Sequence, residues 1–204
     1  MTPSKPIKQT VSPLEKFARL GKRVAFDKGD MLIREGDLTD TVYLILSGRV
    51  KVVVSDADGN ELRLATYGAG DFAGELAFGQ KSRTASVEAL ESTHCAVMTR
   101  DTLRDSLASD PDLAIDLIEL LINRTRATTK LARSLALDSV EERVFAFLND
   151  LAVVQDGQRV VTEKITQQAI AHSVGCSRDM VSKVFKTLVS KRRISVSMEE
   201  IILL

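Results

Sequence analysis

Residues 110–137 read DPDLAIDLIELLINRTRATTKLARSLAL, and this stretch decides how the rest of the chain is organised. Asp110 and Pro111 predict a helix start, because aspartate suits the N-cap and proline suits the first helical position. Neither glycine nor proline follows before Asp138. At 1.5 Å per residue such a helix spans about 40 Å. It is therefore longer than a small domain is wide.

The apolar residues of this helix repeat every seven positions. The repeat forms two rows four positions apart, one with Leu117, Arg124 and Leu131 and the other with Leu121, Thr128 and Leu135. This spacing is typical of a coiled-coil seam, here with a polar insert. We predict that residues 110–137 form a dimerisation helix. The alternative is a long amphipathic helix that packs on its own domain.

The composition restricts the class of protein. A chain of 204 residues with 44% apolar and 27% charged residues holds one large or two small globular domains. The 28 basic and 28 acidic residues cancel, so a nucleic-acid surface has to be local. No segment predicts a membrane span or a signal peptide, and two cysteines cannot form a disulfide framework. We therefore expect a cytoplasmic protein without a membrane partner.

The first half of the chain predicts strands. Residues 1–13 contain three of the four prolines, and we predict a flexible N-terminal tail there. Over residues 14–109, short apolar runs alternate with glycine-containing turns, and Asp58-Gly59 is a hairpin signal. The runs richest in β-branched residues, which favour strands, are 42–46, 50–54, 62–66 and 87–90. Their number and spacing predict an antiparallel jelly-roll domain.

The last part of the chain, residues 138–204, predicts helices again. Ser139 and Glu142 have the spacing of a capping box. Two short helices follow at 166–174 and 177–190, with Gly175-Cys176 between them, and residues 194–204 can form a hairpin. This order predicts a winged helix-turn-helix domain. The fold class is thus α+β.

Residues 70–85 carry the most specific chemistry. In Gly74-Glu75-Leu76 the glycine lets the backbone approach a ligand, and the carboxylate can accept hydrogen bonds from a ribose diol. Arg83 offers a planar fork for phosphate oxygens, and Thr84 adds a hydroxyl and a backbone N–H. A helical turn over 75–80 would also face an anion with its N-terminus. The alternative is an ion pair between Glu75 and Arg83 across a surface loop.

We call residues 70–85 the anion cassette. The order of this cassette, the long helix and the helix-turn-helix resembles the family of the cyclic-AMP receptor protein and the fumarate-and-nitrate regulator, from about residue 20 onward. The resemblance implies that the jelly roll binds a cyclic nucleotide and that the long helix forms the dimer. The resemblance implies that the backbone of Gly74 and Leu76 lies close to the nucleotide and that Glu75 contacts its ribose. Arg83 and Thr84 would contact the cyclic phosphate.

The resemblance also implies that Thr128 meets the purine from the other subunit, which accounts for the polar insert in the seam. Three departures from the cyclic-AMP receptor leave the base open: Ala127 replaces a threonine, Thr84 replaces a serine, and the segment between Glu75 and Arg83 is shorter. Cyclic AMP is the first choice of allosteric ligand and cyclic GMP the second.

Other kinds of cofactor are not expected. The fumarate-and-nitrate branch needs several cysteines for an iron–sulfur cluster, and this chain has only Cys95 and Cys176. A haem sensor needs an axial histidine, for which only His94 and His172 are candidates. A jelly-roll metalloenzyme needs a cluster of histidines and carboxylates, and the barrel region has His94 alone. We predict no metal, haem or iron–sulfur cluster and no catalytic residue.

The second helix of the predicted helix-turn-helix carries side chains suited to DNA. Arg178 can bind a guanine bidentately, and Asp179 can accept from a cytosine, although acids also favour the first helical turn. Lys186 and the basic residues 191–193 suit phosphates. The predicted DNA-binding residues are Thr166, Gln167, Ser177, Arg178, Asp179, Ser182, Lys183 and Lys186. The apolar side of the two helices, expected as core, is Ala169, Ile170, Val174, Met180, Val181, Val184 and Leu188.

The sequence thus predicts a homodimeric transcription regulator that binds a cyclic nucleotide and a two-fold symmetric DNA site, with RNA polymerase as a partner. The alternative is the same DNA-binding regulator with a ligand-free barrel, controlled by the amount of protein or by a protein partner.

Overall fold

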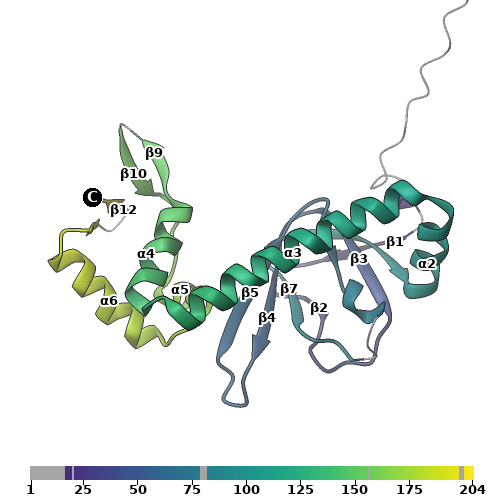
Figure 1. Cartoon of the computed structure of the whole chain (residues 1–204), viewed down its shortest axis with the longest axis horizontal. Helices are drawn as coiled ribbons and strands as arrows, with labels where there is room; N and C mark the ends of the chain where they lie inside the picture. The colour runs from purple at the N-terminus through teal and green to yellow at the C-terminus, as the bar shows by residue number, and fades with distance from the viewer. Residues whose placement is uncertain (1–16, 20, 79–81, 156, 198–199) are drawn as a thin grey trace, which may run out of the picture. The chain divides into compact units, whose positions relative to one another are not determined.

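The computed structural model describes the chain except for residues 1–16, 20, 79–81, 156 and 198–199, so the predicted tail at 1–13 lies outside the described residues (Figure 1). The chain divides into two compact units, residues 1–52 with 66–123 and residues 53–65 with 124–204. Helix α3 (Pro111–Leu137) contributes to both units.

Two four-stranded sheets form the N-terminal domain. The first sheet has the order β1 (Lys22–Phe26), β8 (Thr93–Thr99), β3 (Thr41–Ser47), β6 (Phe72–Ala73). The second has the order β2 (Met31–Ile33), β7 (Ser86–Ala89), β4 (Val50–Ser55), β5 (Glu61–Tyr67). The pairs β1–β8, β8–β3, β3–β6 and β2–β7 are antiparallel. The strands that the sequence predicted correspond to β3, β4, β5 and β7, and the jelly-roll class is confirmed.

Helices cover one face of the first sheet. The buried cluster beside β3 and β8 contains Phe17, Phe72 of β6, Leu103 of helix α2 (Arg100–Ser109), and Leu113 and Leu117 of α3. The rings of Phe17 and Phe72 meet edge to face, with centroids 4.4 Å apart. Burying several large apolar side chains stabilises the fold by about 1.5–3 kcal/mol each. The first half of α3 is therefore part of the N-terminal core.

This packing corrects one sequence expectation. Leu117 is buried in the N-terminal cluster and Leu121 packs against it, so these two residues do not lie on a free dimer seam. The exposed large apolar residues in the first half of the same helix are Ile115, Ile118 and Ile122, which are 54%, 56% and 45% exposed. The heptad pattern was read correctly as helical, but the face packed against the barrel was taken for the free one.

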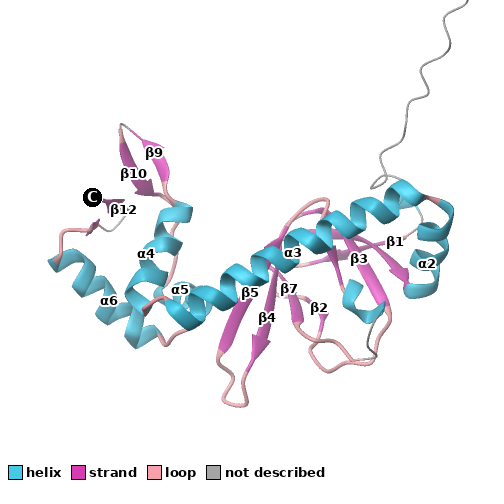
Figure 2. Cartoon of the chain, in the orientation of Figure 1, coloured by secondary structure: helices cyan, strands magenta, loops and turns pink. Residues whose placement is uncertain are grey.

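The described residues from Val140 onward form the helices α4, α5 and α6 and a small sheet (Figure 2). Helix α4 (Val140–Leu151) begins with the predicted capping box: Ser139 Oγ accepts from the Glu142 N–H, and Glu142 Oε2 accepts from the Ser139 N–H. The two helices of the helix-turn-helix are α5 (Gln167–Val174) and α6 (Arg178–Ser190). The sheet has the order β11 (Ile194–Val196), β12 (Ile201–Leu203), β10 (Gln158–Val161), β9 (Val153–Gln155). β9 was not predicted.

The core of this domain contains most of the predicted stripe. Ile170, Val174, Val181, Val184 and Leu188 are buried together with Val144 and Leu148 of α4. Two residues differ from the prediction, because Ala169 is half-buried and Met180 is 40% exposed. The place of Met180 in the first turn of α6, one residue before buried Val181, puts it on the outer side of the helix. None of the described helices combines the length and apolar character required to span a bilayer.

The turn between β3 and β4 gives a test of the barrel geometry. Gly48 has φ +85°, and a Cβ there would lie 2.5 Å from both the Ser92 carbonyl oxygen and Thr93 Oγ1. We expect Gly48→Ala to cost about 1–3 kcal/mol for the left-handed backbone, with a further loss from this overlap. Gly59→Ala is the matched control, because Gly59 has φ +81° and nothing within 4 Å. Calorimetric unfolding should therefore show a larger loss for Gly48→Ala, and equal losses would contradict the packing described here.

Candidate functional site

A small pocket lies within the barrel, where the predicted cassette was expected. Its lining includes Gly74, Glu75, Leu76, Arg83 and Thr84, so the five cassette residues do come together. The remaining lining residues are Ile33, Val52, Tyr67, Ala73, Ser82, Ala85 and Val87. The volume of the pocket is about 70 Å³. It is below the ~300–1,000 Å³ of typical small-molecule sites.

Arg83 is the structural centre of this pocket. Its Nε donates to Thr39 Oγ1 at 2.8 Å, and its Nη1 donates to the Gly74 carbonyl at 2.8 Å. Its Nη2 donates to both the carbonyl and the Oγ1 of Thr41, at 2.5 and 3.0 Å. These acceptors are uncharged. Of the five N–H groups of a guanidinium, one on Nη1 remains after these four contacts among the described residues.

The backbone of Arg83 is held as firmly as its side chain. The Gly36 N–H donates to the Arg83 carbonyl, and the Arg83 N–H donates to the Asp37 carbonyl, each at 2.9 Å. The side chain is only 5% exposed. Burial lowers the pKa of the guanidinium, while Tyr43 and the nearby carboxylates, Asp40 first among them, act in the opposite direction. A buried cation whose direct contacts are neutral is costly, and an anion in the pocket would offset that cost.

Gly74 is required by the close approach of Arg83. Its φ is +86°, and a Cβ there would lie 2.8 Å from both Arg83 Nη1 and the Thr41 carbonyl oxygen. The next residues form a short 3₁₀ turn, η1 (Glu75–Phe78), so part of the predicted turn over 75–80 is present. Leu76 is mostly exposed at the pocket edge. The side chain of Arg83 donates its hydrogen bonds to Thr39, Thr41 and Gly74. None of these acceptors is the Glu75 carboxylate, which the alternative interpretation paired with Arg83.

Thr128 lies in the half of α3 that belongs to the other compact unit, and it is exposed. Its predicted contact with a purine stays a prediction. Sequence reasoning missed Thr39, Thr41 and Tyr67. No motif marks the two threonines, since they act through Arg83, whereas Tyr67 ends β5 and its alternation could have indicated an inward side chain.

Histidine and cysteine do not form a further centre in the described part of the chain. No group of three or more His, Cys, Asp or Glu side chains there is arranged to hold a metal ion. His94 Nδ1 is 3.3 Å from Ser47 Oγ on an exposed strand surface. Burial raises the pKa of the Cys95 thiol to about 11, and it also raises the pKa of Cys176.

The predicted DNA-binding residues occupy the outer side of the helix-turn-helix. Thr166 and Ser177 are the N-caps of α5 and α6, accepting from the N–H groups of Ala169 and Met180. Four of the predicted residues of α6 are exposed, namely Arg178, Asp179, Lys183 and Lys186, while Ser182 is half-buried. Gln167, Ser182 and Lys186 line one shallow concavity with Phe185, Val189, Ser190 and Val196. The structure thus brings these three predicted residues together.

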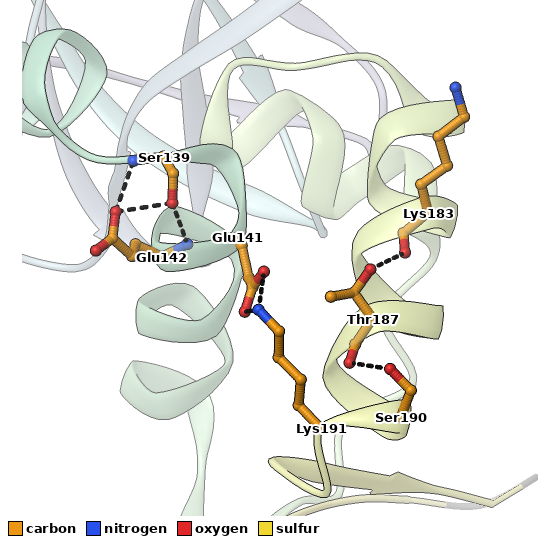
Figure 3. A network of polar contacts seen from close by, with 7 residues as sticks. All are labelled: Ser139, Glu141, Glu142, Lys183, Thr187, Ser190 and Lys191. Carbon is orange, nitrogen blue, oxygen red and sulfur yellow. Dashed lines mark hydrogen bonds and ion pairs between the residues drawn. The ribbon is translucent and has the colours of Figure 1, made fainter.

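The cations that follow α6 are used differently from the prediction. Lys191 reaches back to α4 and pairs with Glu141 at 2.8 Å, whereas Lys183 extends away from this network (Figure 3). The Arg193 guanidinium stacks 3.7 Å over the Phe145 ring, a cation–π contact. Lys191 and Arg193 therefore serve the packing of the domain first. The phosphate role predicted for Lys186 and residues 191–193 stays a prediction, and Lys183, Lys186, Lys191 and Arg192 are exposed.

Two domain families match the two parts of the chain. The family described as the cyclic nucleotide-binding domain matches residues 23–110, and the Crp-like helix-turn-helix domain matches residues 142–204. The chain is 34% identical over 165 residues to a CRP-like cAMP-activated global transcriptional regulator of Mycobacterium tuberculosis (strain ATCC 25618 / H37Rv). That match covers 78% of this chain and 74% of the relative.

Two further relatives agree over more of the length. The cAMP-activated global transcriptional regulator Vfr of Pseudomonas aeruginosa is 31% identical over 186 residues, 86% of each chain. The solved structure of the c-di-GMP-responsive global regulator CLP of Xanthomonas campestris superposes with a TM-score of 0.80 at 25% identity, covering 94% of this chain and 97% of that one. These relatives are transcription regulators rather than enzymes. The chain therefore belongs to the CRP/FNR family of transcription regulators, with a cyclic nucleotide-binding domain and a DNA-binding helix-turn-helix.

Proposed function

We propose that this protein is a homodimeric transcription regulator whose DNA binding responds to cyclic AMP, with cyclic GMP as the second choice. Residues 14–109 form the ligand-binding domain, residues 110–137 the dimerisation helix and residues 138–204 the DNA-binding domain. The observation that carries the proposal is the buried Arg83 guanidinium, whose direct partners are uncharged. A cyclic phosphate supplies the missing negative charge.

The other cassette residues suit the remainder of the nucleotide. The Glu75 carboxylate accepts from the ribose hydroxyl, Thr84 assists at the phosphate, and Gly74 and Leu76 contribute backbone beside the sugar. A cavity of about 70 Å³ accommodates only part of a nucleotide, so the base extends to groups outside the barrel. Thr128 of the dimerisation helix is the proposed group at the base. Because two relatives of this chain are named cAMP-activated regulators, we propose adenine as the base.

The proposed dimer uses the exposed apolar stripe of α3. Ile115, Ile118 and Ile122 alternate by three and four residues, which is the spacing of a coiled-coil seam. The same alternation continues through four exposed, smaller residues: Thr125, Thr129, Ala132 and Ala136. Small residues allow two helices to approach closely. Dimerisation supplies two recognition helices, which matches a two-fold symmetric DNA site. RNA polymerase is the proposed partner on DNA.

Removal of the Arg83 charge tests the ligand site. Calorimetric titration of the wild type should show binding of cyclic AMP in preference to cyclic GMP. Arg83→Gln should weaken that binding by about 10- to 100-fold, because hydrogen bonds to a charged group contribute about 1.5–3 kcal/mol. Since Arg83 also ties Thr39 and Thr41 to Gly74, circular dichroism has to establish that the variant is folded.

Thr39 provides a milder variant of the same test. Thr39→Val removes the acceptor for Arg83 Nε and should weaken binding several-fold, while Thr39→Ser keeps the acceptor and should retain affinity. Titrations with c-di-GMP and 5′-AMP complete the set, because the structural relative CLP responds to c-di-GMP. Absence of heat with both cyclic mononucleotides at two temperatures contradicts the proposed ligand.

A charge in the α3 stripe tests the dimer. We expect Ile118→Glu to convert a dimer into monomers in sedimentation velocity, because two carboxylates would be buried against each other in the seam. Leu38→Glu is the control, since Leu38 is also exposed, at 76%, but lies in a barrel loop. A dimer that persists in Ile118→Glu at the same concentration places the interface elsewhere.

Two substitutions in α6 separate base reading from phosphate contact. On sites selected from random DNA by the wild type, Arg178→Ala should lose about 1–3 kcal/mol and relax the preference at one base pair of each half-site. Lys186→Ala should weaken binding to all sequences alike and reduce the salt dependence. Fluorescence anisotropy at fixed salt measures both. An unchanged base preference in Arg178→Ala excludes its role as a base reader.

A further inference from the structure

Arg143, in the first turn of α4, connects the ends of two other helices. Its Nε donates to the Val174 carbonyl at 2.9 Å, and its Nη1 donates to the Asp138 carbonyl at 2.9 Å. Longer contacts join Nη1 to the Leu135 carbonyl at 3.5 Å and Nη2 to the Gly175 carbonyl at 3.4 Å. All four acceptors are main-chain oxygens within one compact unit.

These oxygens belong to the C-terminal ends of α3 and α5. The last carbonyls of a helix lack intrahelical partners and carry the negative end of the helix dipole. A guanidinium presents its donors in a fixed planar fork, so one side chain can satisfy carbonyls of two helix ends at once. Lysine, with a single ammonium on a flexible stem, cannot reproduce that geometry.

A second, independent contact joins the same two helix ends. Gly175 is the left-handed C-cap of α5, with φ +68°. A Cβ at that position would lie 2.9 Å from Leu135 Cδ2 in the last turns of α3. The turn of the helix-turn-helix therefore packs directly against the side chain of Leu135, while Arg143 binds the carbonyls on both sides of the contact.

The recognition helix begins immediately after this joint. The Cys176 N–H donates to the Ala171 carbonyl, and Ser177 is the N-cap of α6. Only Cys176 separates Gly175, which Arg143 and Leu135 contact, from that N-cap. The start of α6 is thus placed by the end of α3 through two residues of turn.

We infer that Arg143 is a positioning residue for DNA recognition, which fixes the start of the recognition helix α6 to the end of the long helix α3. In a dimer, the end of α3 then sets the separation of the two recognition helices, and hence the spacing of half-sites that the protein accepts. This inference rests on the proposed homodimer. It assigns Arg143 no contact with DNA or with the cyclic nucleotide.

The experiment varies the spacing of the two half-sites. On selected DNA and on copies with one base pair added or removed between the half-sites, the spacing constraint of symmetric dimers predicts about tenfold discrimination by the wild type. Arg143→Met should lose most of this discrimination, while its titration with cyclic AMP stays unchanged. Arg143→Lys should fall between the two and serves if Arg143→Met does not fold.

Arg159→Met is the matched control. Arg159 also donates to a helix-end carbonyl in the same domain, that of Asn149 at 2.7 Å, but this helix end belongs to α4 and not to α3 or α5. Its removal should leave the spacing discrimination at the wild-type value. Equal discrimination by Arg143→Met and wild type overturns the inference, and so does an equal loss in Arg159→Met, which would indicate a general loss of stability.

Hydrogen exchange distinguishes a failure of this inference from a failure of the proposed dimer. Arg143→Met should accelerate exchange of the amides at 135–138 and 175–177, and Arg159→Met should not. If the wild type shows no spacing preference, the homodimer proposal fails, and exchange alone then decides the role of Arg143. If the exchange rates of both segments are unchanged in Arg143→Met, Arg143 does not hold the ends of α3 and α5 together.

Discussion

The burial of one side of α3 is the constraint on which both units depend, because each unit uses a different part of the same unbroken helix. Leu113 and Leu117 complete the core beside β3 and β8, and Leu135 packs against the turn of the helix-turn-helix. No glycine or proline lies between Leu113 and Leu135, so all three residues belong to one continuous α-helix. The isoleucines on its opposite side, Ile115, Ile118 and Ile122, remain exposed.

Two arginines show how the same chemistry serves different ends. Both Arg83 and Arg143 direct their guanidinium groups at main-chain oxygens. At Arg143 the acceptors are helix C-termini, whose partial negative charge already suits a cation. At Arg83 the acceptors are a glycine carbonyl, two threonines and no helix end, inside a buried pocket, so the positive charge is less well balanced. An anionic ligand would balance the charge of Arg83, whereas the contacts of Arg143 already hold two helix ends within the chain.

In the DNA-binding domain, too, the contacts of each basic side chain depend on its neighbours in the fold. The chain as a whole is neutral, and two of the basic residues after α6, Lys191 and Arg193, are engaged by Glu141 and Phe145. Arg178, Lys183 and Lys186 of α6 are exposed, and exposed positive charge of this kind attracts the phosphates of DNA. Counting charges along the chain could not separate these two groups, since pairing depends on how α4 packs beside α6.

The sequence by itself determined the strand-rich domain, the long helix from Asp110, the capping box at Ser139 and the two helices of the DNA-binding motif. These features are local: turn glycines, N-caps and helical periodicity act over a few residues. The cassette was also found, because Gly74 and Arg83 have distinctive chemistry at a short spacing. Only the tertiary structure decided which face of α3 is covered, that Thr39 and Thr41 hold Arg83, and that Arg143 joins two helix ends. Each of these depends on residues distant in sequence, and periodicity cannot tell which of two apolar faces finds a partner within the chain.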